Sequence, residues 1–279
     1  MATPQQKIKR KLPGVVDIAY EQYKRDLQRY QIAKELMSHN VVTTTPEALL
    51  VEVARIMGEK HIGSLIVLKY KTPVGIVTER DLLSKVLAFG DFLGDEKVKD
   101  VMSYPLFSVS FTSKIKEVAR LMILKKSRLA VFDSGKLFGI ITASDLIKSL
   151  PDVPETEVKV DDFMTKDVIT ADGEAFVINI AKIMGKKRIG SVVITREDEP
   201  FGIFTERDLV TNFLAQGKSM YRELGPVCSH PLIAIPAGTS VHRAAATMAL
   251  KHIRRLPVVK DDKLVGIITA RDLVEAYAK

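Results

Sequence analysis

The sequence contains a single cysteine, Cys228, so no disulfide can form within the chain. Disulfides persist in oxidising compartments, and this usage therefore favours a reducing one; we expect a cytoplasmic protein. Long apolar runs are also absent, and stretches such as residues 65–68 are far too short to cross a bilayer. The N-terminus carries Gln, Lys and Arg where a signal peptide has its apolar core, so we expect neither export nor membrane insertion.

The sequence patterns of common catalytic and metal sites are missing as well. The 5 histidines show no metal-site spacing, and Cys228 with His230 alone is a poor ligand set. Gly217-Lys218-Ser219 resembles the end of a phosphate-binding loop, but Asn212 stands where its first glycine belongs. No combination of nucleophile, general base and oxyanion donor can be assembled. The sequence therefore predicts a non-enzyme without metal or cofactor.

The first informative feature that the sequence does have is its charge, with a formal net charge of +8. A large share lies in residues 1–37, which include the run KIKRK at residues 7–11. A basic excess is compatible with phosphate-bearing ligands of any size, from a nucleotide to nucleic acid, and does not choose between them.

Four segments of the chain repeat one another. They read GIVTERDL, GIITASDL, GIFTERDL and GIITARDL, and they begin at Gly75, Gly139, Gly202 and Gly266. The steps between them are 64, 63 and 64 residues, and each copy follows an apolar helix pattern and a short apolar strand pattern. The offset from Thr78 to Thr205 equals that from Thr142 to Thr269, 127 residues. A two-repeat module was therefore duplicated whole, and we expect repeat one to pair with two, and three with four.

The repeats and their connections divide the chain into six segments. Pro151 and Pro154 disfavour a continuous helix and mark a linker in the middle. The predicted segments are a basic N-terminal arm and amphipathic helix at residues 1–32, repeat one at 33–92, repeat two at 93–150, the linker at 151–158, repeat three at 159–216 and repeat four at 217–279.

The amphipathic stretch near the N-terminus has apolar residues at alternating steps of four and three. We expect it to form a helix that docks on its own module, in preference to a coiled-coil seam with a partner. The residues on this face are Val16, Tyr20, Tyr23, Leu27 and Tyr30.

Within one repeat the pattern predicts strand, helix, strand, strand, helix. In repeat one, residues 41–45 are a short β-rich run before Pro46, and apolar residues then recur at helical spacing up to Met57. Two strands follow at residues 63–68 and 72–78, and residues 79–87 read as a second helix. One such repeat is too small to bury both helices and both sheet faces, so we predict an α/β fold of paired repeats.

In each repeat Gly, two apolar residues, Thr, two variable residues and Asp lead from a strand into a helix. The glycine leaves room for a ligand near the backbone, and the threonine and aspartate could divide a nucleotide between phosphate and sugar. Thr78 and Asp81 could equally form a capping box that stabilises the helix without any ligand. Against capping alone, the acidic residue is Asp in all four copies, although Glu or Gln is the usual partner.

Together these motifs carry a family resemblance. Each repeat resembles a cystathionine β-synthase (CBS) domain, and each pair resembles a Bateman module, over about residues 33–279. Further matching features are the strand RRLPVV from Arg254 and the lead-in segments AKELM, VKDVM and VDDFM near the starts of repeats one, two and three. The resemblance implies four β-α-β-β-α units in two pseudo-twofold modules. It also implies a regulatory protein that senses AMP, ADP or ATP in clefts between paired units and acts on a partner.

The resemblance implies a role for each motif position. The aspartates would hold ribose: Asp81, Asp145, Asp208 and Asp272. The threonines would meet ribose or phosphate: Thr78, Thr142, Thr205 and Thr269. The residues before the aspartates would lie close to the phosphates: Arg80, Ser144, Arg207 and Arg271. The residues after the glycines would wall the adenine pocket: Ile76, Ile140, Ile203 and Ile267. Arginines at the start of the strand would add phosphate contacts: Arg128, Arg254 and Arg255.

The four copies differ in ways that predict unequal binding. Repeats one and three have Gly-Ser where the other two have arginine, so polyphosphates should bind there more weakly. Repeat four has RELGP at residues 222–226 in place of a Met-ended lead-in, which predicts an altered pocket entrance. We therefore expect two strong sites, one per module.

Other functions remain open on the sequence alone. The basic N-terminal arm could bind nucleic acid, although no recognised motif supports this. The chain could also be a regulatory subunit that senses S-adenosylmethionine for a separate enzyme or transporter. A homodimer is compatible with either alternative.

Overall fold

The structure is a computed structural model that describes residues 17–18, 20, 30–90, 93–149 and 158–278. The predictions for the basic run at residues 7–11 and for residues 151–157 of the linker lie outside these residues. Among the residues that are placed, none of the helices has the length and apolar character needed to cross a membrane.

Each repeat forms one three-stranded sheet. In repeat one, β1 (Thr43–Thr44) runs parallel to β2 (Ser64–Lys69), which runs antiparallel to β3 (Thr72–Thr78). The same order recurs in the other repeats, which confirms the predicted α/β fold. Their strands are β4 (Ser108–Ser110), β5 (Leu129–Asp133) and β6 (Lys136–Ile141); β7 (Thr170–Asp172), β8 (Ser191–Arg196) and β9 (Glu199–Thr205); and β10 (Ile235–Pro236), β11 (Arg255–Lys260) and β12 (Lys263–Thr269).

Two helical segments complete each repeat. The first helices are α3 (Leu50–Glu59), α6 (Ile115–Lys125), α8 (Val177–Lys187) and α10 (Val241–Lys251). The closing helices are α4 (Glu79–Leu82), α7 (Ala143–Leu146), α9 (Glu206–Asn212) and α11 (Ala270–Ala278). Short turns follow three of them: η1 (Leu83–Leu87), η2 (Ile147–Ser149) and η4 (Leu214–Gln216). In repeat one the closing helix widens into a π turn at η1, because the Ala88 N–H bonds to the carbonyl of Leu83, five residues back.

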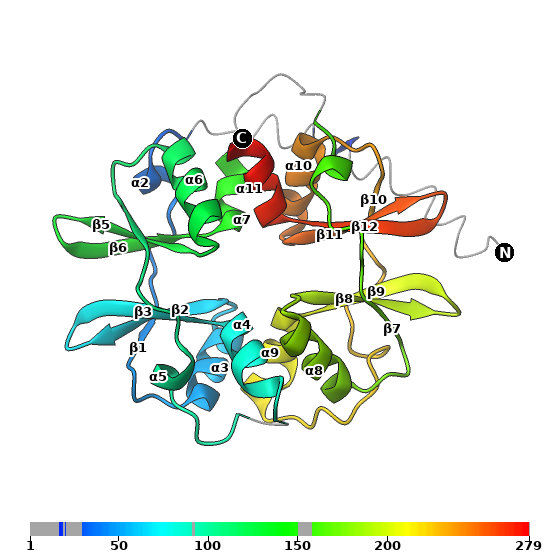
Figure 1. The fold of residues 1–279 in the computed structure, drawn as a ribbon, viewed down its shortest axis with the longest axis horizontal. Helices are drawn as coiled ribbons and strands as arrows, with labels where there is room; N and C mark the ends of the chain where they lie inside the picture. Colours follow the sequence, from blue (N-terminus) through cyan, green and yellow to red (C-terminus); the bar gives the residue numbers. More distant parts are fainter. Residues whose placement is uncertain (1–16, 19, 21–29, 91–92, 150–157, 279) are drawn as a thin grey trace. The chain divides into compact units, whose positions relative to one another are not determined.

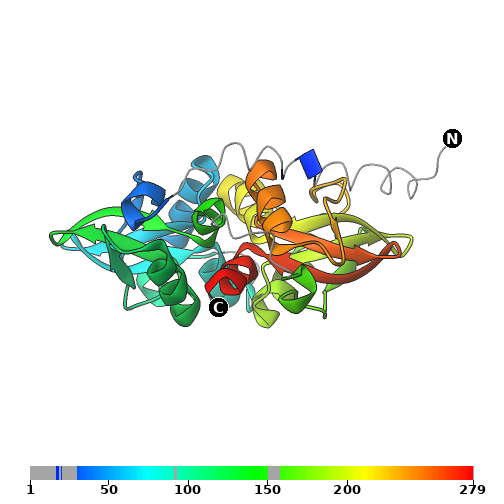
Figure 2. The same ribbon diagram turned by 90° about the horizontal axis from the view of Figure 1, so that it is seen from above.

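The lead-in segments are exchanged between the repeats of each predicted pair. The lead-in segment of repeat one contains α2 (Ala33–Leu36), and its Ser38 pairs with Ile140 of repeat two. The lead-in segment of repeat two contains α5 (Val98–Val101), and its Ser103 pairs with Ile76 of repeat one. Figure 2 shows α2, in blue, beside the green strands of repeat two. Repeats three and four exchange segments in the same way, through η3 (Val160–Asp162) with Thr165↔Ile267, and through Ser229↔Ile203. The exchange follows the predicted pairing.

Helix packing groups the repeats differently, into two compact units. The inner unit consists of Val41–Leu106 and Ile169–Leu232, and thus holds repeats one and three. The terminal unit consists of Met1–Asn40, Phe107–Val168 and Ile233–Lys279, and holds repeats two and four. Each has its own hydrophobic core. In the inner unit α3 packs on α9 and η4, and α8 on η1; in the terminal unit α11 packs on α6 and α7 (Figure 1).

Glycine allows the helices of the inner unit to approach closely. A Cβ on Gly185 of α8 would lie 2.6 Å from the Leu83 carbonyl oxygen and 2.9 Å from the Ala88 Cβ. A Cβ on Gly58 of α3 would collide with the Cβ of Ala215 in the same way. Both glycines follow a methionine at the end of the first helix, and the terminal unit has larger residues there.

The described part of the N-terminal arm docks on repeat four, which corrects the prediction that it packs on its own module of repeats one and two. Tyr20 is buried, and the Arg243 guanidinium of α10 lies 5.3 Å from the centre of its ring. Asp17 accepts a hydrogen bond from Arg243 at 2.6 Å. Val16, Tyr23 and Leu27 lie outside the described residues.

Candidate functional site

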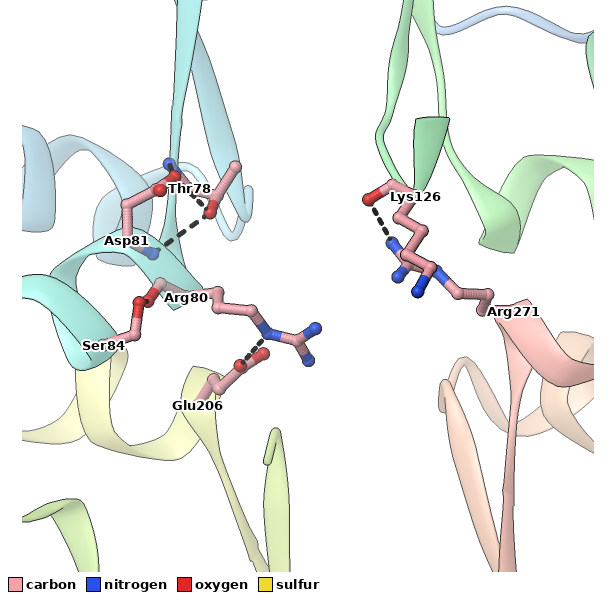
Figure 3. A network of polar contacts seen from close by, with 7 residues as sticks. All are labelled: Thr78, Arg80, Asp81, Ser84, Lys126, Glu206 and Arg271. Atoms are coloured by element: carbon pink, nitrogen blue, oxygen red, sulfur yellow. Dashed lines mark hydrogen bonds and ion pairs between the residues drawn. The ribbon is translucent and has the colours of Figure 1, made fainter. Parts of the chain in front are cut away.

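Each threonine–aspartate motif folds into the same hydrogen-bonded box. In repeat one, the Thr78 N–H and hydroxyl donate to Asp81 Oδ2 at 2.9 and 2.6 Å, and the Asp81 N–H donates to Thr78 Oγ1 at 3.2 Å (Figure 3). The other repeats form the same pair of bonds to one carboxylate oxygen, in Thr142–Asp145, Thr205–Asp208 and Thr269–Asp272. The capping-box interpretation is therefore confirmed, and one oxygen of every motif aspartate is folded back onto its own helix start.

The second carboxylate oxygen faces the exchanged lead-in segment in the inner unit. Asp81 Oδ1 accepts from the Ser103 hydroxyl at 3.1 Å and lies 2.9 Å from Lys85 Nζ. In repeat three, Asp208 Oδ1 accepts from the Ser229 hydroxyl at 3.5 Å. Capping thus uses one oxygen and leaves the other in contact with exchangeable polar groups. A ligand hydroxyl could take the place of a serine hydroxyl there, because a carboxylate oxygen accepts more than one hydrogen bond.

The motif carboxylates lie in shielded surroundings. Asp81 and Asp145 are buried, and Asp145 Oδ1 lies 3.7 Å from Lys148 Nζ. Burial raises the pKa of Asp272 above its usual value, and the hydrogen bonds from Thr269 oppose this shift only in part.

The motif glycines make room for the chain itself. A Cβ on Gly75 would lie 2.8 Å from the Ser103 carbonyl oxygen, and a Cβ on Gly202 would lie 2.9 Å from that of Ser229. A Cβ on Gly139 or Gly266 would similarly meet a methionine of the lead-in segment of the paired repeat. The prediction that glycine admits a ligand to the backbone is therefore corrected: at all four positions the closest neighbour is the exchanged lead-in.

The lead-in of repeat four keeps this geometry despite its different sequence. Cys228 takes the position of the methionine, and its Sγ would lie 2.7 Å from a Cβ on Gly202. His230 follows and stacks on Phe201, with ring centres 4.9 Å apart. The sequence already indicated this equivalence, because PVCSHP at residues 226–231 repeats the spacing of Ser and Pro in DVMSYP at residues 100–105. The lead-in of repeat four thus keeps the contact with the glycine of repeat three, while its side chains differ.

Two of the arginines expected near phosphate are paired with glutamates. Arg80 donates to Glu206 at 2.9 Å, and Arg207 donates to Glu79 at 3.2 Å (Figure 3 shows the first pair). Neither glutamate was among the predicted site residues, although TERD occurs only in repeats one and three. In the terminal unit, Arg271 donates to the Lys126 carbonyl at 2.9 Å.

The remaining predicted residues lie at the ends of strands beside the boxes. Ile76 is buried, whereas Ile140, Ile203 and Ile267 are half-buried in the corresponding third strands. Ser144 is half-buried between Thr142 and Asp145. Arg128 directly precedes β5 and Arg255 begins β11. The Arg254 carbonyl accepts the Ala270 N–H at 2.9 Å, which ties the start of β11 to that of α11.

A groove of about 520 Å³ lies elsewhere in the inner unit. Its lining includes Pro46, Tyr70, Val74 and Tyr104, near the hairpin that joins β2 and β3. None of the predicted site residues is part of this lining. Within the described part of the chain, no cluster of three or more His, Cys, Asp or Glu could hold a metal ion.

Comparison with known proteins gives a family match over most of the chain. The model described as CBS domain matches four times, at residues 33–88, 98–152, 160–215 and 223–279. An uncharacterised protein of Methanopyrus kandleri is 37% identical over 120 residues, which are 42% of this chain and 61% of that protein. An uncharacterised protein of Methanocaldococcus jannaschii is 29% identical over 265 residues, which are 88% of this chain and 61% of that protein. The matches thus span less than two thirds of the length of either relative.

The fold also has a counterpart among solved structures. A crystal structure of another Methanocaldococcus jannaschii protein, described as a candidate archaeal homologue of γ-AMPK, superposes with a TM-score of 0.74 at 20% identity. The match covers 88% of this chain and 99% of that one. At this identity the likeness concerns the fold alone.

Proposed function

Because this chain belongs to the CBS domain family, we propose that it is a regulatory protein that senses adenine nucleotides and transmits their binding to a partner protein. In this proposal AMP, ADP or ATP binds at the threonine–aspartate boxes. The protein acts in the cytoplasm, and its partner is a separate effector or a second copy of the chain. The basic net charge of +8 favours anionic ligands of this kind.

One observation carries the proposal. In the inner unit, the second oxygen of each capping carboxylate already accepts a hydroxyl, from Ser103 at Asp81 and from Ser229 at Asp208. A ribose offers two neighbouring hydroxyls, which suit the same acceptor. The box therefore holds the carboxylate in a fixed orientation with an acceptor oxygen ready for a sugar.

The choice of adenine nucleotides follows the name of a protein with the same fold. The chain shares its fold with the protein described as a candidate homologue of γ-AMPK, a name that connects that protein with AMP. Repetition of the motif in all four repeats supports several sites per chain.

Isothermal titration of the full chain with AMP, ADP, ATP and S-adenosylmethionine tests the proposal. The informative variant replaces the four motif aspartates, Asp81, Asp145, Asp208 and Asp272, with asparagine. Asparagine keeps one carbonyl oxygen for the Thr N–H but loses the charge and the second acceptor oxygen. We expect micromolar or tighter binding of at least one adenine nucleotide, and its loss in the variant.

A native circular dichroism spectrum and a cooperative unfolding transition would show that the asparagine variant is folded. Nucleotide binding that persists in this folded variant would rule out the proposed role of the aspartates. Binding of S-adenosylmethionine but of no nucleotide would replace the proposed ligand class.

A further inference from the structure

Reciprocal ion pairs join repeats one and three within the inner unit. Each pair links an arginine that directly precedes a motif aspartate to a glutamate that directly follows the motif threonine of the other repeat. The Arg80 Nε donates to Glu206 Oε1 at 2.9 Å, and the Arg207 Nε donates to Glu79 Oε1 at 3.2 Å. The residues that pair are 126 and 128 positions apart in the sequence, so each repeat neutralises an arginine of the other.

The two partners of each pair differ in accessibility. The Glu206 and Glu79 side chains are only 8% and 2% exposed, whereas those of Arg80 and Arg207 are 45% and 36% exposed. A phosphate could therefore reach the arginine, but the glutamate could not follow the arginine toward solvent. If a phosphate drew the guanidinium away, a buried carboxylate would lose an ion-pair partner, which is strongly unfavourable.

The terminal unit lacks these carboxylates. Ala143 and Ala270 occupy the positions of Glu79 and Glu206, so no glutamate is supplied at either. In addition, the terminal unit has arginines at the start of its second strands, whereas the inner unit has Gly63-Ser64 and Gly190-Ser191 there. The two units thus present motifs of the same shape in surroundings of different charge.

From this contrast we propose that Glu79 and Glu206 are built-in anions that take the place of ligand phosphates, so that the inner-unit boxes accept adenosine or AMP and disfavour ATP. The terminal-unit boxes, with alanine at these positions, accept the polyphosphate. The inference rests on the proposed function and adds to it a division of ligands between the units. Its physical basis is competition of two anions for one guanidinium, in which the buried anion is already in place.

The test measures ligand binding at the inner-unit boxes only, within the full chain. Asp145→Asn and Asp272→Asn together impair the terminal-unit boxes and provide the reference protein. Adding Glu79→Ala and Glu206→Ala gives the inner unit the residues that the terminal unit has naturally. Titrations with adenosine, AMP and ATP then compare the two proteins, and size-exclusion chromatography and thermal unfolding report on folding.

In the reference protein we expect ATP to bind at least about tenfold more weakly than AMP. The two alanine substitutions should tighten ATP binding by about tenfold, the effect of about one charge-assisted hydrogen bond, and leave adenosine binding unchanged. Adding Arg80→Ala and Arg207→Ala should remove this gain, because the cations that the glutamates released are then absent. If the alanine variant does not fold, Glu79→Gln and Glu206→Gln remove the charge while keeping the shape and should give the same gain.

ATP binding to the reference protein as tight as AMP binding, and unaffected by loss of the glutamates, would overturn the inference and leave the proposed function standing. A gain in ATP affinity that persists after the two arginines are replaced would also overturn the inference. If the full wild-type chain binds neither adenosine, AMP nor ATP, the proposed function fails first and the inference fails with it.

Discussion

At the scale of single residues, the motif aspartates combine a structural and a ligand-binding role. Their Oδ2 atoms accept from the Thr N–H and hydroxyl, which stabilises the start of the closing helix. In Asp81 the Oδ1 atom meets Ser103 and Lys85. Substitutions that remove the whole carboxyl group therefore damage the fold and the proposed site together, and asparagine is the better probe.

The pKa of Asp272 gives a prediction at this scale. Because burial raises the pKa of Asp272, its carboxyl group stays protonated up to a higher pH in the folded state than in the unfolded state. The contribution of this protonation to the free energy of unfolding is complete below the pKa of Asp272 in the unfolded state. It is lost as the pH rises through the pKa of Asp272 in the folded state. In urea unfolding between pH 3 and 7, the stability of Asp272→Asn relative to wild type should therefore increase with pH. A difference that does not vary with pH would contradict the assignment.

Cys228 gives a second residue-scale prediction. The thiol is buried, its Sγ lies 3.4 Å from the Gly225 carbonyl, and burial raises its pKa, so little reactive thiolate forms at neutral pH. Iodoacetamide should modify the native protein on the order of 100-fold more slowly than the urea-unfolded protein. Mass spectrometry measures both rates, with Cys228→Ser as the unreactive control. Equal rates would show that the thiol is accessible in the native state.

At the scale of elements, close backbone approach decides where glycine is needed. The lead-in segments cross the third strand of the neighbouring repeat, and Gly75 is where Ser103 passes. Gly58 and Gly185 serve the helix contacts of the inner unit in the same manner. These glycines act by lacking a side chain rather than by adopting an unusual backbone angle.

This distinction predicts the outcome of glycine substitutions. Gly75→Ala should lower the free energy of unfolding by about 1–3 kcal/mol, because its Cβ would lie 2.8 Å from a backbone oxygen that cannot easily move. The matched control is Gly173→Ala, whose Cβ would have its nearest neighbours at 3.6 Å and should be tolerated. Chemical denaturation measures the free energy of unfolding of both variants. Similar effects of the two variants would refute the role assigned to the lead-in contact.

At the scale of the whole molecule, each compact unit is assembled from distant parts of the chain. Repeats one and two are adjacent in the sequence, yet one belongs to the inner unit and the other to the terminal unit. Each half of the chain therefore supplies one repeat to each hydrophobic core. Neither half contains a complete unit, so we expect the two halves to depend on each other.

Splitting the chain tests this dependence. Fragments 1–153 and 154–279 produced together should form a stable 1:1 complex, because their helices bury the apolar faces of each other in both cores. Either fragment alone should self-associate, since it exposes the face that normally packs on the other half. Size-exclusion chromatography with light scattering distinguishes these states. Two fragments that remain stable monomers when mixed would contradict the assembly described for the units.

By itself the sequence determined the repeats and the order of strands and helices, and it offered the capping box of Thr78 and Asp81 as one of two interpretations. All of these depend on residues close together in the chain, where hydrophobic periodicity and local hydrogen bonds leave a direct pattern. From equal offsets along the chain it also predicted the pairs of repeats, one with two and three with four, between which the structure exchanges lead-in segments.

Only the tertiary structure decided that Arg80 faces Glu206, that Gly75 makes room for a crossing segment, and that repeats one and three share a core. Each of these contacts joins residues far apart in the chain. Their partners depend on how whole repeats pack, so a local pattern such as TERD marks a difference between repeats without naming the residue that it meets.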